Sequence, residues 1–180
     1  MPDLEKFLKN RLSDAHSVAV LGIGSELRSD DIAGILAAGE FEKRLAKTRP
    51  SINSGRALSL PKGRKKTIFK VFFGSTAPEN LTGEIKAFKP DHIIIIDTVD
   101  MNEKPGTVIA VPISEIASGV TFSTHKMPAK ILADYFIKSL KCGITMIGIQ
   151  PSSLEFGKPV SPSVRNSAKY VAGSIVAAVR

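Results

Sequence analysis

Two nearly uninterrupted apolar runs constrain the fold of this chain most strongly. Residues 17–21 and 93–96 lack the polar alternation of a strand with one face in water, and each ends in a distinctive signal. Gly22-Ile23-Gly24 follows the first run, and Asp97 follows the second. Continuous runs of this length are typical of parallel strands that helices cover on both faces. Because parallel neighbours need helical crossovers, the runs predict an α/β fold.

Periodicity and turn residues predict the remaining elements. Helices are predicted at residues 3–12, 31–45, 80–88, 128–141 and 162–179, and strands at 17–21, 67–73, 92–96, 107–111 and 144–149. This alternation indicates a three-layer α/β/α sandwich with a mostly parallel five-stranded sheet. Ser29 or Asp30 is expected to cap the second helix, and Gly143 to end the helix at 128–141.

Length and composition favour one domain over residues 1–180, because 180 residues with 43% hydrophobic composition suffice for a single core. The amino-terminal residues lack the pattern of a secretory signal, and the longest apolar runs are too short to span a bilayer. Cys142 is the only cysteine, so an intrachain disulfide is excluded. We therefore expect a cytoplasmic protein without a membrane partner.

The net charge of +8 arises within residues 41–66, where nine basic residues face one acidic residue, Glu42. Pro and Gly residues predict that most of this stretch, at about 48–66, is a basic loop. The stretch lacks the interleaved aromatic residues that stack on bases. A solvated basic loop is therefore favoured over a nucleic-acid-binding module.

Three residues form a candidate metal site: Asp31, Asp97 and His125. Ligands of open α/β sheets bind beyond the carboxyl ends of the strands. Asp31 follows the first predicted strand and Asp97 ends the third, whereas His16 and His92 lie at the opposite ends of these strands. Topology therefore selects His125 among the three histidines. Carboxylate oxygen and imidazole nitrogen suit a divalent cation of the first transition row.

Each of these residues also has a simpler interpretation. Asp31 is suited to a helix start, Asp97 to bonding loop amides, and His125 to a loop before a helix. Asp30 and Asp100 are expected to orient ligands or to cap. A dinucleotide fingerprint is rejected because its third glycine would fall at Leu27. Cys142 is interpreted as a small buried thiol rather than a nucleophile.

Several motifs together resemble those of the nickel-iron hydrogenase maturation endopeptidases. Within that family they are most similar to the branch that processes the large subunit of the formate-hydrogenlyase type hydrogenase, hydrogenase 3. The motifs occur in order along the chain: Gly22-Ile23-Gly24 with Asp30-Asp31, Ser75-Thr76-Ala77-Pro78-Glu79-Asn80, Asp97-Thr98-Val99-Asp100-Met101 with Pro105-Gly106, Thr124-His125-Lys126-Met127-Pro128, and Gly148-Ile149-Gln150-Pro151. Ser25 departs from the Asn that the family usually has after Gly-x-Gly, and residues 48–66 are longer and more basic than usual.

The resemblance implies a protease that removes a carboxyl-terminal extension from the hydrogenase large-subunit precursor after nickel insertion. It assigns the catalytic and metal-contacting positions to Asp31, Asp97 and His125. It also implies that nickel is contributed by the substrate rather than permanently bound, with the nickel acting in recognition or in catalysis. We expect a monomer whose partner is the precursor.

Two alternatives remain open from the sequence. One is a metal-dependent hydrolase that carries its own cation and acts on a small substrate, which metal analysis of the purified chain would reveal. The other is a nucleic-acid-binding module that uses residues 41–66, which predicts strongly salt-dependent binding.

Overall fold

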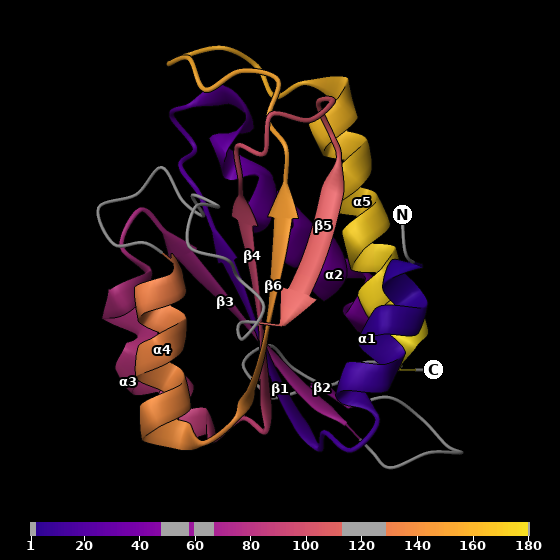
Figure 1. The fold of residues 1–180 in the computed structure, drawn as a ribbon, viewed down its shortest axis with the longest axis vertical. Coiled ribbons are helices and arrows are strands. Elements are labelled where there is room, and N and C mark those ends of the chain that lie inside the picture. The colour runs from indigo at the N-terminus through magenta and orange to yellow at the C-terminus, as the bar shows by residue number, and fades with distance from the viewer. Residues whose placement is uncertain (1–2, 48–57, 60–66, 113–128, 180) are drawn as a thin grey trace.

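The computed structural model describes residues 3–47, 58–59, 67–112 and 129–179. A twisted sheet forms the middle layer, with the strand order β2-β3-β1-β4-β6-β5 (Figure 1). The strands are β1 (Ser17–Ile23), β2 (Leu58–Ser59), β3 (Ile68–Ser75), β4 (His92–Thr98), β5 (Val108–Pro112) and β6 (Gly143–Ile149). The predicted five strands are confirmed, and the two-residue β2 is an addition within the stretch that was expected to be a loop.

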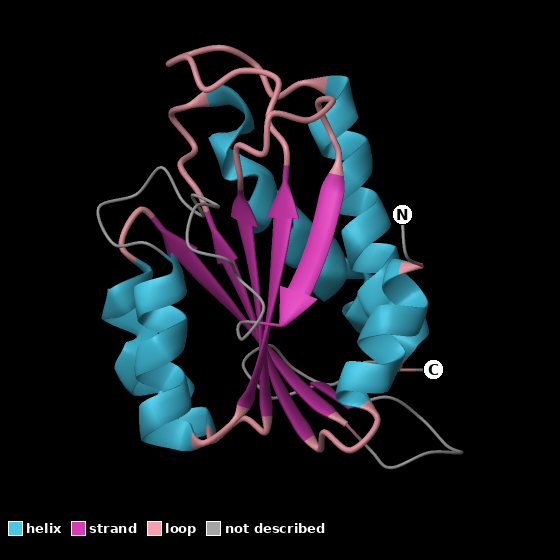
Figure 2. Ribbon diagram, in the orientation of Figure 1, coloured by secondary structure: helices cyan, strands magenta, loops and turns pink. Residues whose placement is uncertain are grey.

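Helices cover both faces of the sheet (Figures 1 and 2). One face carries α1 (Leu4–Leu12), α2 (Ala33–Lys47) and α5 (Pro162–Ala178), and the other carries α3 (Thr82–Phe88) and α4 (Ala129–Leu140). Short 3-10 helices, η1 (Ser29–Ile32) and η2 (Pro78–Leu81), precede α2 and α3. The predicted three-layer α/β/α arrangement is confirmed. Among the described residues, no helix combines the length and the apolar character needed to cross a membrane.

Alternate residues of the central strands enter two separate cores. Ile94 and Ile96 of β4 pack in the core beneath α1, α2 and α5, whereas Ile93 and Ile95 pack in the core beneath α3 and α4. All four side chains have no exposed surface. The apolar run at 93–96 is therefore uninterrupted because both faces of β4 are buried.

The sheet is mixed, with mostly parallel strands, as predicted. β3, β1, β4 and β6 are parallel, while β5 runs antiparallel to β6 and β2 antiparallel to β3. The connection from β4 to β5 holds only residues 99–107 and contains no helix. Because a parallel pair needs a longer crossover, β5 cannot join this edge in the parallel sense.

The end of α4 differs from the prediction. Lys141, with φ of +54°, takes the left-handed conformation after the helix, and Gly143 instead opens β6. A side chain at position 143 would collide with the imidazole of His92, the residue paired with Gly143 across β4 and β6. Gly143 is thus required by strand pairing and not by the helix end.

Candidate functional site

The carboxyl ends of the neighbouring strands β1 and β4 carry the two predicted carboxylates. Asp31 lies in η1, beyond the end of β1, and Asp97 lies near the end of β4. Both residues are buried, with 1% and 0% of their surface exposed. The Oγ1 of Thr98 donates to the Asp30 carbonyl oxygen at 3.1 Å, which joins η1 to the end of β4. The structure therefore places Asp31 and Asp97 at the same edge of the sheet, as predicted.

Glycines allow η1 and α2 to pack directly on this edge. A Cβ at Gly34 would collide with the carbonyl oxygens of Ile96 and Ile23, so the start of α2 rests on the ends of both strands. Gly24 has φ of +154°, and a Cβ there would collide with the Asp31 carbonyl oxygen. The glycines around 22–24 thus serve a tight return of the chain that carries Asp31.

Asp97 makes a local hydrogen bond at the end of its own strand. Its Oδ1 accepts a hydrogen bond from the amide of Thr98 at 2.8 Å. His125, the third predicted residue, lies outside the described residues. Within the part of the chain that the structure describes, no group of three or more His, Cys, Asp or Glu side chains is arranged to hold a metal ion. The three-residue site thus stays a prediction.

Asp30 connects η1 to the loop at 150–161, which leads from β6 to α5. Its buried carboxylate accepts four hydrogen bonds, from the amides of Ser152 (2.8 Å), Ser153 (3.2 Å) and Ser161 (2.6 Å) and from Ser161 Oγ (2.9 Å). The expectation that Ser29 or Asp30 caps α2 is wrong, because Ser29 Oγ donates to Pro159 and Asp30 binds this loop. Asp30 instead fixes the segment that presents Asp31.

Gln150 orders the loop that follows Asp97. Its Oε1 accepts from the amides of Met101 (2.6 Å) and Glu103 (3.3 Å), and its Nε2 donates to Asp100 Oδ1 at 3.2 Å. Hydrogen bonds from the Asn102 amide and from Gln150 hold the pKa of Asp100 below its ordinary value. From the sequence, Gln150 is part of a motif but has no predicted role. The signal was a polar residue that directly follows an apolar strand.

His92 and Cys142 lie at the opposite end of the strands, as predicted for His92. His92 is buried at the start of β4, and its Nε2 lies 2.9 Å from Thr145 Oγ1. Burial, with repulsion from Arg11, lowers the pKa of His92 to about 4. Cys142 is buried beside β6, and burial raises the pKa of its thiol. A largely buried thiol with a raised pKa is a poor nucleophile, in agreement with the interpretation of Cys142 as a small buried thiol.

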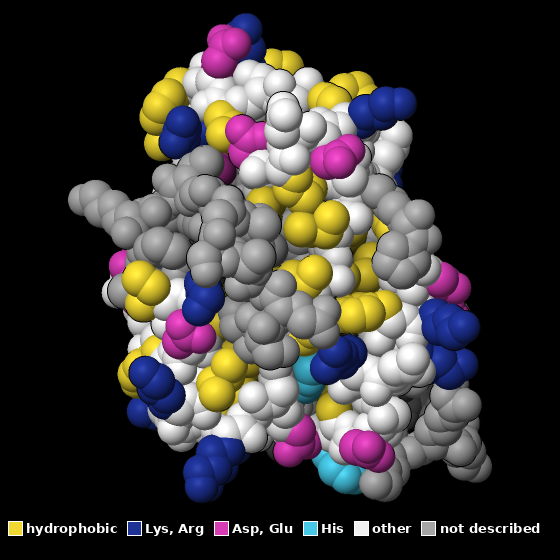
Figure 3. All heavy atoms as spheres, in the orientation of Figure 1, with side chains coloured by type: hydrophobic (Ala, Val, Ile, Leu, Met, Phe, Trp, Pro, Cys, Tyr) yellow, Lys and Arg dark blue, Asp and Glu magenta, His cyan; other side chains and the backbone are white. Residues whose placement is uncertain are grey.

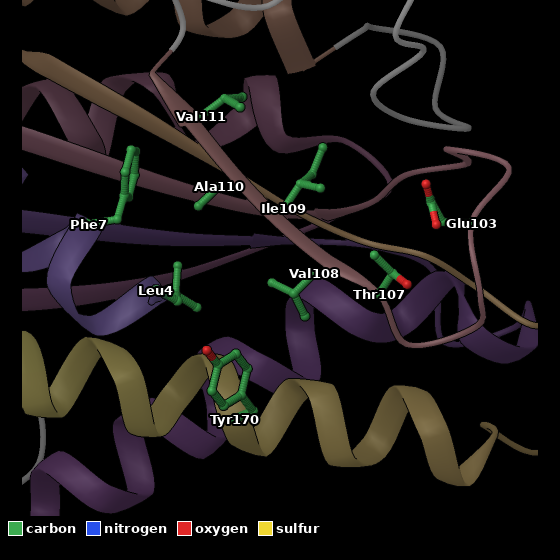
Figure 4. A pocket seen from close by; sticks show the side chains of 9 residues that line it. All are labelled: Leu4, Phe7, Glu103, Thr107, Val108, Ile109, Ala110, Val111 and Tyr170. Atoms are coloured by element: carbon green, nitrogen blue, oxygen red, sulfur yellow. The ribbon is translucent and has the colours of Figure 1, made fainter. Parts of the chain in front are cut away.

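A cavity of about 440 Å³ lies elsewhere, along β5 and between α1 and α5 (Figure 4). The space-filling view shows hydrophobic side chains gathered near the middle of this face (Figure 3). The cavity is lined by Leu4, Phe7, Glu103, Thr107, Val108, Ile109, Ala110, Val111 and Tyr170. Neither Asp31 nor Asp97 is among them, so this cavity does not mark the carboxylate edge.

Curated relatives of this chain are hydrogenase maturation proteases. One assigned in Methanocaldococcus jannaschii is 28% identical over 173 residues, which cover 96% of this chain and 94% of the relative. The Hydrogenase 3 maturation protease of Escherichia coli K12 is 26% identical over 84% of each chain.

Solved structures of the same class share the fold. The crystal structure of the hydrogenase maturation protease HycI from Thermococcus kodakarensis matches with a TM-score of 0.72 and 26% identity, covering 96% of this chain and 98% of its own. The solution structure of the endopeptidase HycI from Escherichia coli matches with a TM-score of 0.66 and 25% identity over 87% of each chain.

A family profile gives the broadest assignment. The profile described as hydrogenase maturation protease, HycI, matches residues 60–178. This range is more than half of the chain and includes Asp97 and position 125, while Asp31 precedes it. The match agrees with the family inferred from the motifs. The chain is therefore a peptidase that belongs to the hydrogenase maturation protease (HycI) family.

Proposed function

We propose that this protease removes the carboxyl-terminal extension of a nickel-iron hydrogenase large-subunit precursor after nickel has been inserted. Asp31, Asp97 and His125 contact the nickel that the substrate carries. The observation that supports the proposal best is the placement of two buried carboxylates at the carboxyl edge of neighbouring parallel strands. Ligands of open α/β sheets bind at that edge.

The chemistry of these side chains suits a cation delivered by another protein. Carboxylates in a water-poor environment attract a cation more strongly than they would in bulk water. Nickel held by the substrate polarises the scissile carbonyl, activates a water, or serves only as a recognition signal. Asp31 or Asp97 is a suitable general base toward that water. The proposal needs no nucleophile from Cys142.

We further propose that the substrate belongs to the formate-hydrogenlyase type of hydrogenase. The support is the likeness to the HycI structure of Thermococcus kodakarensis and to the Escherichia coli Hydrogenase 3 maturation protease. Precursors of this type and of another nickel-iron hydrogenase, presented in parallel, distinguish the branches. Preferential cleavage of the second precursor would contradict this assignment.

The central experiment mixes the purified chain with nickel-loaded and nickel-free precursor and measures the product masses. We expect one cut that releases the carboxyl-terminal extension, and only from the nickel-loaded form. Efficient cleavage of the nickel-free precursor would show that nickel does not gate the reaction. Metal analysis of the chain alone belongs to the same experiment, because stoichiometric bound metal would favour a hydrolase with its own cation.

Three variants test the assignment of the site. Asp31→Asn, Asp97→Asn and His125→Ala should each lower kcat/KM for the nickel-loaded precursor by about 100-fold or more. Asp134→Asn and His16→Ala are matched controls, because the side chain of Asp134 is 45% exposed and His16 is exposed before β1, at the other edge. Thermal unfolding checks that each variant is folded. Normal processing by His125→Ala would remove His125 from the site.

A further inference from the structure

Two large apolar side chains are displayed to solvent beside the carboxylate edge. Leu27 is 69% exposed and Phe156 is 71% exposed, the highest values among the exposed large hydrophobic residues that the structure describes. Leu27 lies in the turn between β1 and η1, and Phe156 lies in the loop at 150–161. Single exposed apolar residues are common, but adjacent ones are typical of interaction sites.

Direct contacts hold the two loops side by side at the carboxyl end of the strands (Figure 1). The amide of Gly157 donates to the Leu27 carbonyl oxygen at 3.0 Å, and Arg28 Nε donates to the Leu154 carbonyl oxygen at 3.3 Å. The guanidinium of Arg28 lies over the Phe156 ring, 5.3 Å from its centroid. These contacts place the exposed Leu27 and Phe156 side chains on adjoining loops, and we name the pair the Leu27–Phe156 patch.

Several interactions order the segment that carries Phe156. Lys158 forms an ion pair with Glu155 at 2.7 Å, and Gly157 supplies a residue with φ of +69°. The Asp30 carboxylate bonds both ends of the loop, at Ser152 and Ser161. An apolar surface that is already ordered loses less conformational entropy when a partner covers it. Aromatic residues and arginine are also enriched at protein interfaces.

We propose that the Leu27–Phe156 patch docks an apolar surface of the protein substrate and so orients it toward Asp31. This proposal rests on the proposed function, because it names the large-subunit precursor as the occupant. The physical link is η1, in which Asp30 anchors the Phe156 loop and the next residue is Asp31. A partner seated on the patch is thereby positioned relative to the carboxylate edge.

The test compares Leu27→Ser, Phe156→Ser and the double variant with wild type, using nickel-loaded precursor. Each single variant should raise KM about tenfold, as expected when one large apolar contact is lost, while kcat and the unfolding temperature stay unchanged. Leu27→Met and Phe156→Leu retain an apolar side chain and should keep KM near the wild-type value. Tyr170→Ser is the matched control, since Tyr170 is 47% exposed and lies in the cavity along β5.

The outcomes separate the patch from the proposed function. Unchanged KM in the double variant, or a raised KM in Tyr170→Ser alone, would overturn the patch. Size-exclusion chromatography adds a further check. If the wild type were a dimer and the serine variants were monomers with unchanged KM, a second copy of the chain would cover the patch.

If the wild-type protein does not cleave the precursor, precursor binding is measured by interferometry instead. Binding that weakens in the serine variants would then support the patch while the proposed function fails. Absence of binding to wild type would overturn both.

Discussion

At the scale of single residues, Asp30 and Asp31 show how adjacent identical side chains differ in their surroundings. Both are buried at the start of η1. The carboxylate of Asp30 is saturated by hydrogen bonds from the loop at 150–161, whereas Asp31 belongs to the edge where β1 and β4 end. The partners of the Asp30 carboxylate lie more than 100 residues further along the chain, so local sequence does not reveal its role.

Asp30→Ala should lower the free energy of unfolding by about 3 kcal/mol, because buried amide donors lose a charged acceptor. Asp100→Ala is the control, since Asp100 is exposed and accepts bonds only from Asn102 and Gln150 in the described part of the chain. We expect a clearly smaller loss for it in urea-induced unfolding. Equal losses in the two variants would contradict the anchoring role of Asp30.

Gly24 and Gly83 allow the same substitution, glycine to alanine, to be compared at a crowded position and at an open one. Gly24→Ala should destabilise the protein and slow precursor cleavage, because the added Cβ would meet the Asp31 carbonyl oxygen. Gly83 lies in α3, and a Cβ added there would meet no atom within 4 Å, so Gly83→Ala should raise the free energy of unfolding by about 0.5–1 kcal/mol. Thermal unfolding and a cleavage assay measure both. Normal activity in Gly24→Ala would show that η1 tolerates displacement.

At the scale of elements, the pairing of β4 with β6 depends on His92 and Gly143. The imidazole of His92 packs over Gly143 and contacts Thr145, so two strands share one buried polar contact. The pKa of His92 is about 4, below its ordinary value of 6.5. The folded protein therefore holds a neutral imidazole under conditions in which the unfolded chain binds a proton.

This difference predicts a pH dependence of stability. Because the folded pKa is depressed, the contribution of His92 is complete above pH 6.5 and is lost as the pH falls toward 4. The loss should approach about 3 kcal/mol. Urea-induced unfolding between about pH 7.5 and 4 measures it. The His92→Gln variant lacks this titrating group and should flatten this part of the profile. Identical profiles for wild type and His92→Gln would contradict the assignment.

At the scale of the whole molecule, the position of the positive charge bears on partners. The net charge of +8 is accounted for by residues 41–66, so the rest of the chain is neutral overall. We expect no tight binding to nucleic acid at physiological salt. Fluorescence anisotropy with labelled single-stranded and duplex DNA, over a range of salt concentrations, tests this. Tight binding that disappears when Lys62, Arg64, Lys65 and Lys66 are changed to Gln would favour the alternative of a nucleic-acid-binding module.

The order of the helices and strands and their layering were predictable because burial determines the pattern of hydrophobic residues along the sequence. The run at 93–96 is apolar because both of its faces are covered, and that much is local information. The apolar run of β5 reads alike in either direction, and only the short connection at 99–107, which contains no helix, indicates the antiparallel sense. Gly143 was wrongly predicted to end a helix, because the need for glycine at this position comes from His92 on the neighbouring strand.

The candidate site was predictable only in part. Topology places Asp31 and Asp97 at one edge, and the structure bears this out. The roles of Asp30 and Gln150 depend on hydrogen bonds to segments that are distant in sequence, so they required the fold. His125 lies outside the described residues, and its role stays a prediction.

The bonding of Asp30 has a consequence for protein engineering. Its carboxylate makes the β1–η1 turn and the loop at 150–161 one mechanical unit, although they are far apart in the chain. If the loop at 150–161 were transferred into another protease without Arg28 and Asp30, the hydrogen bonds from these two residues to the loop would be lost. Recombination among such enzymes should therefore treat the two segments as a single cassette.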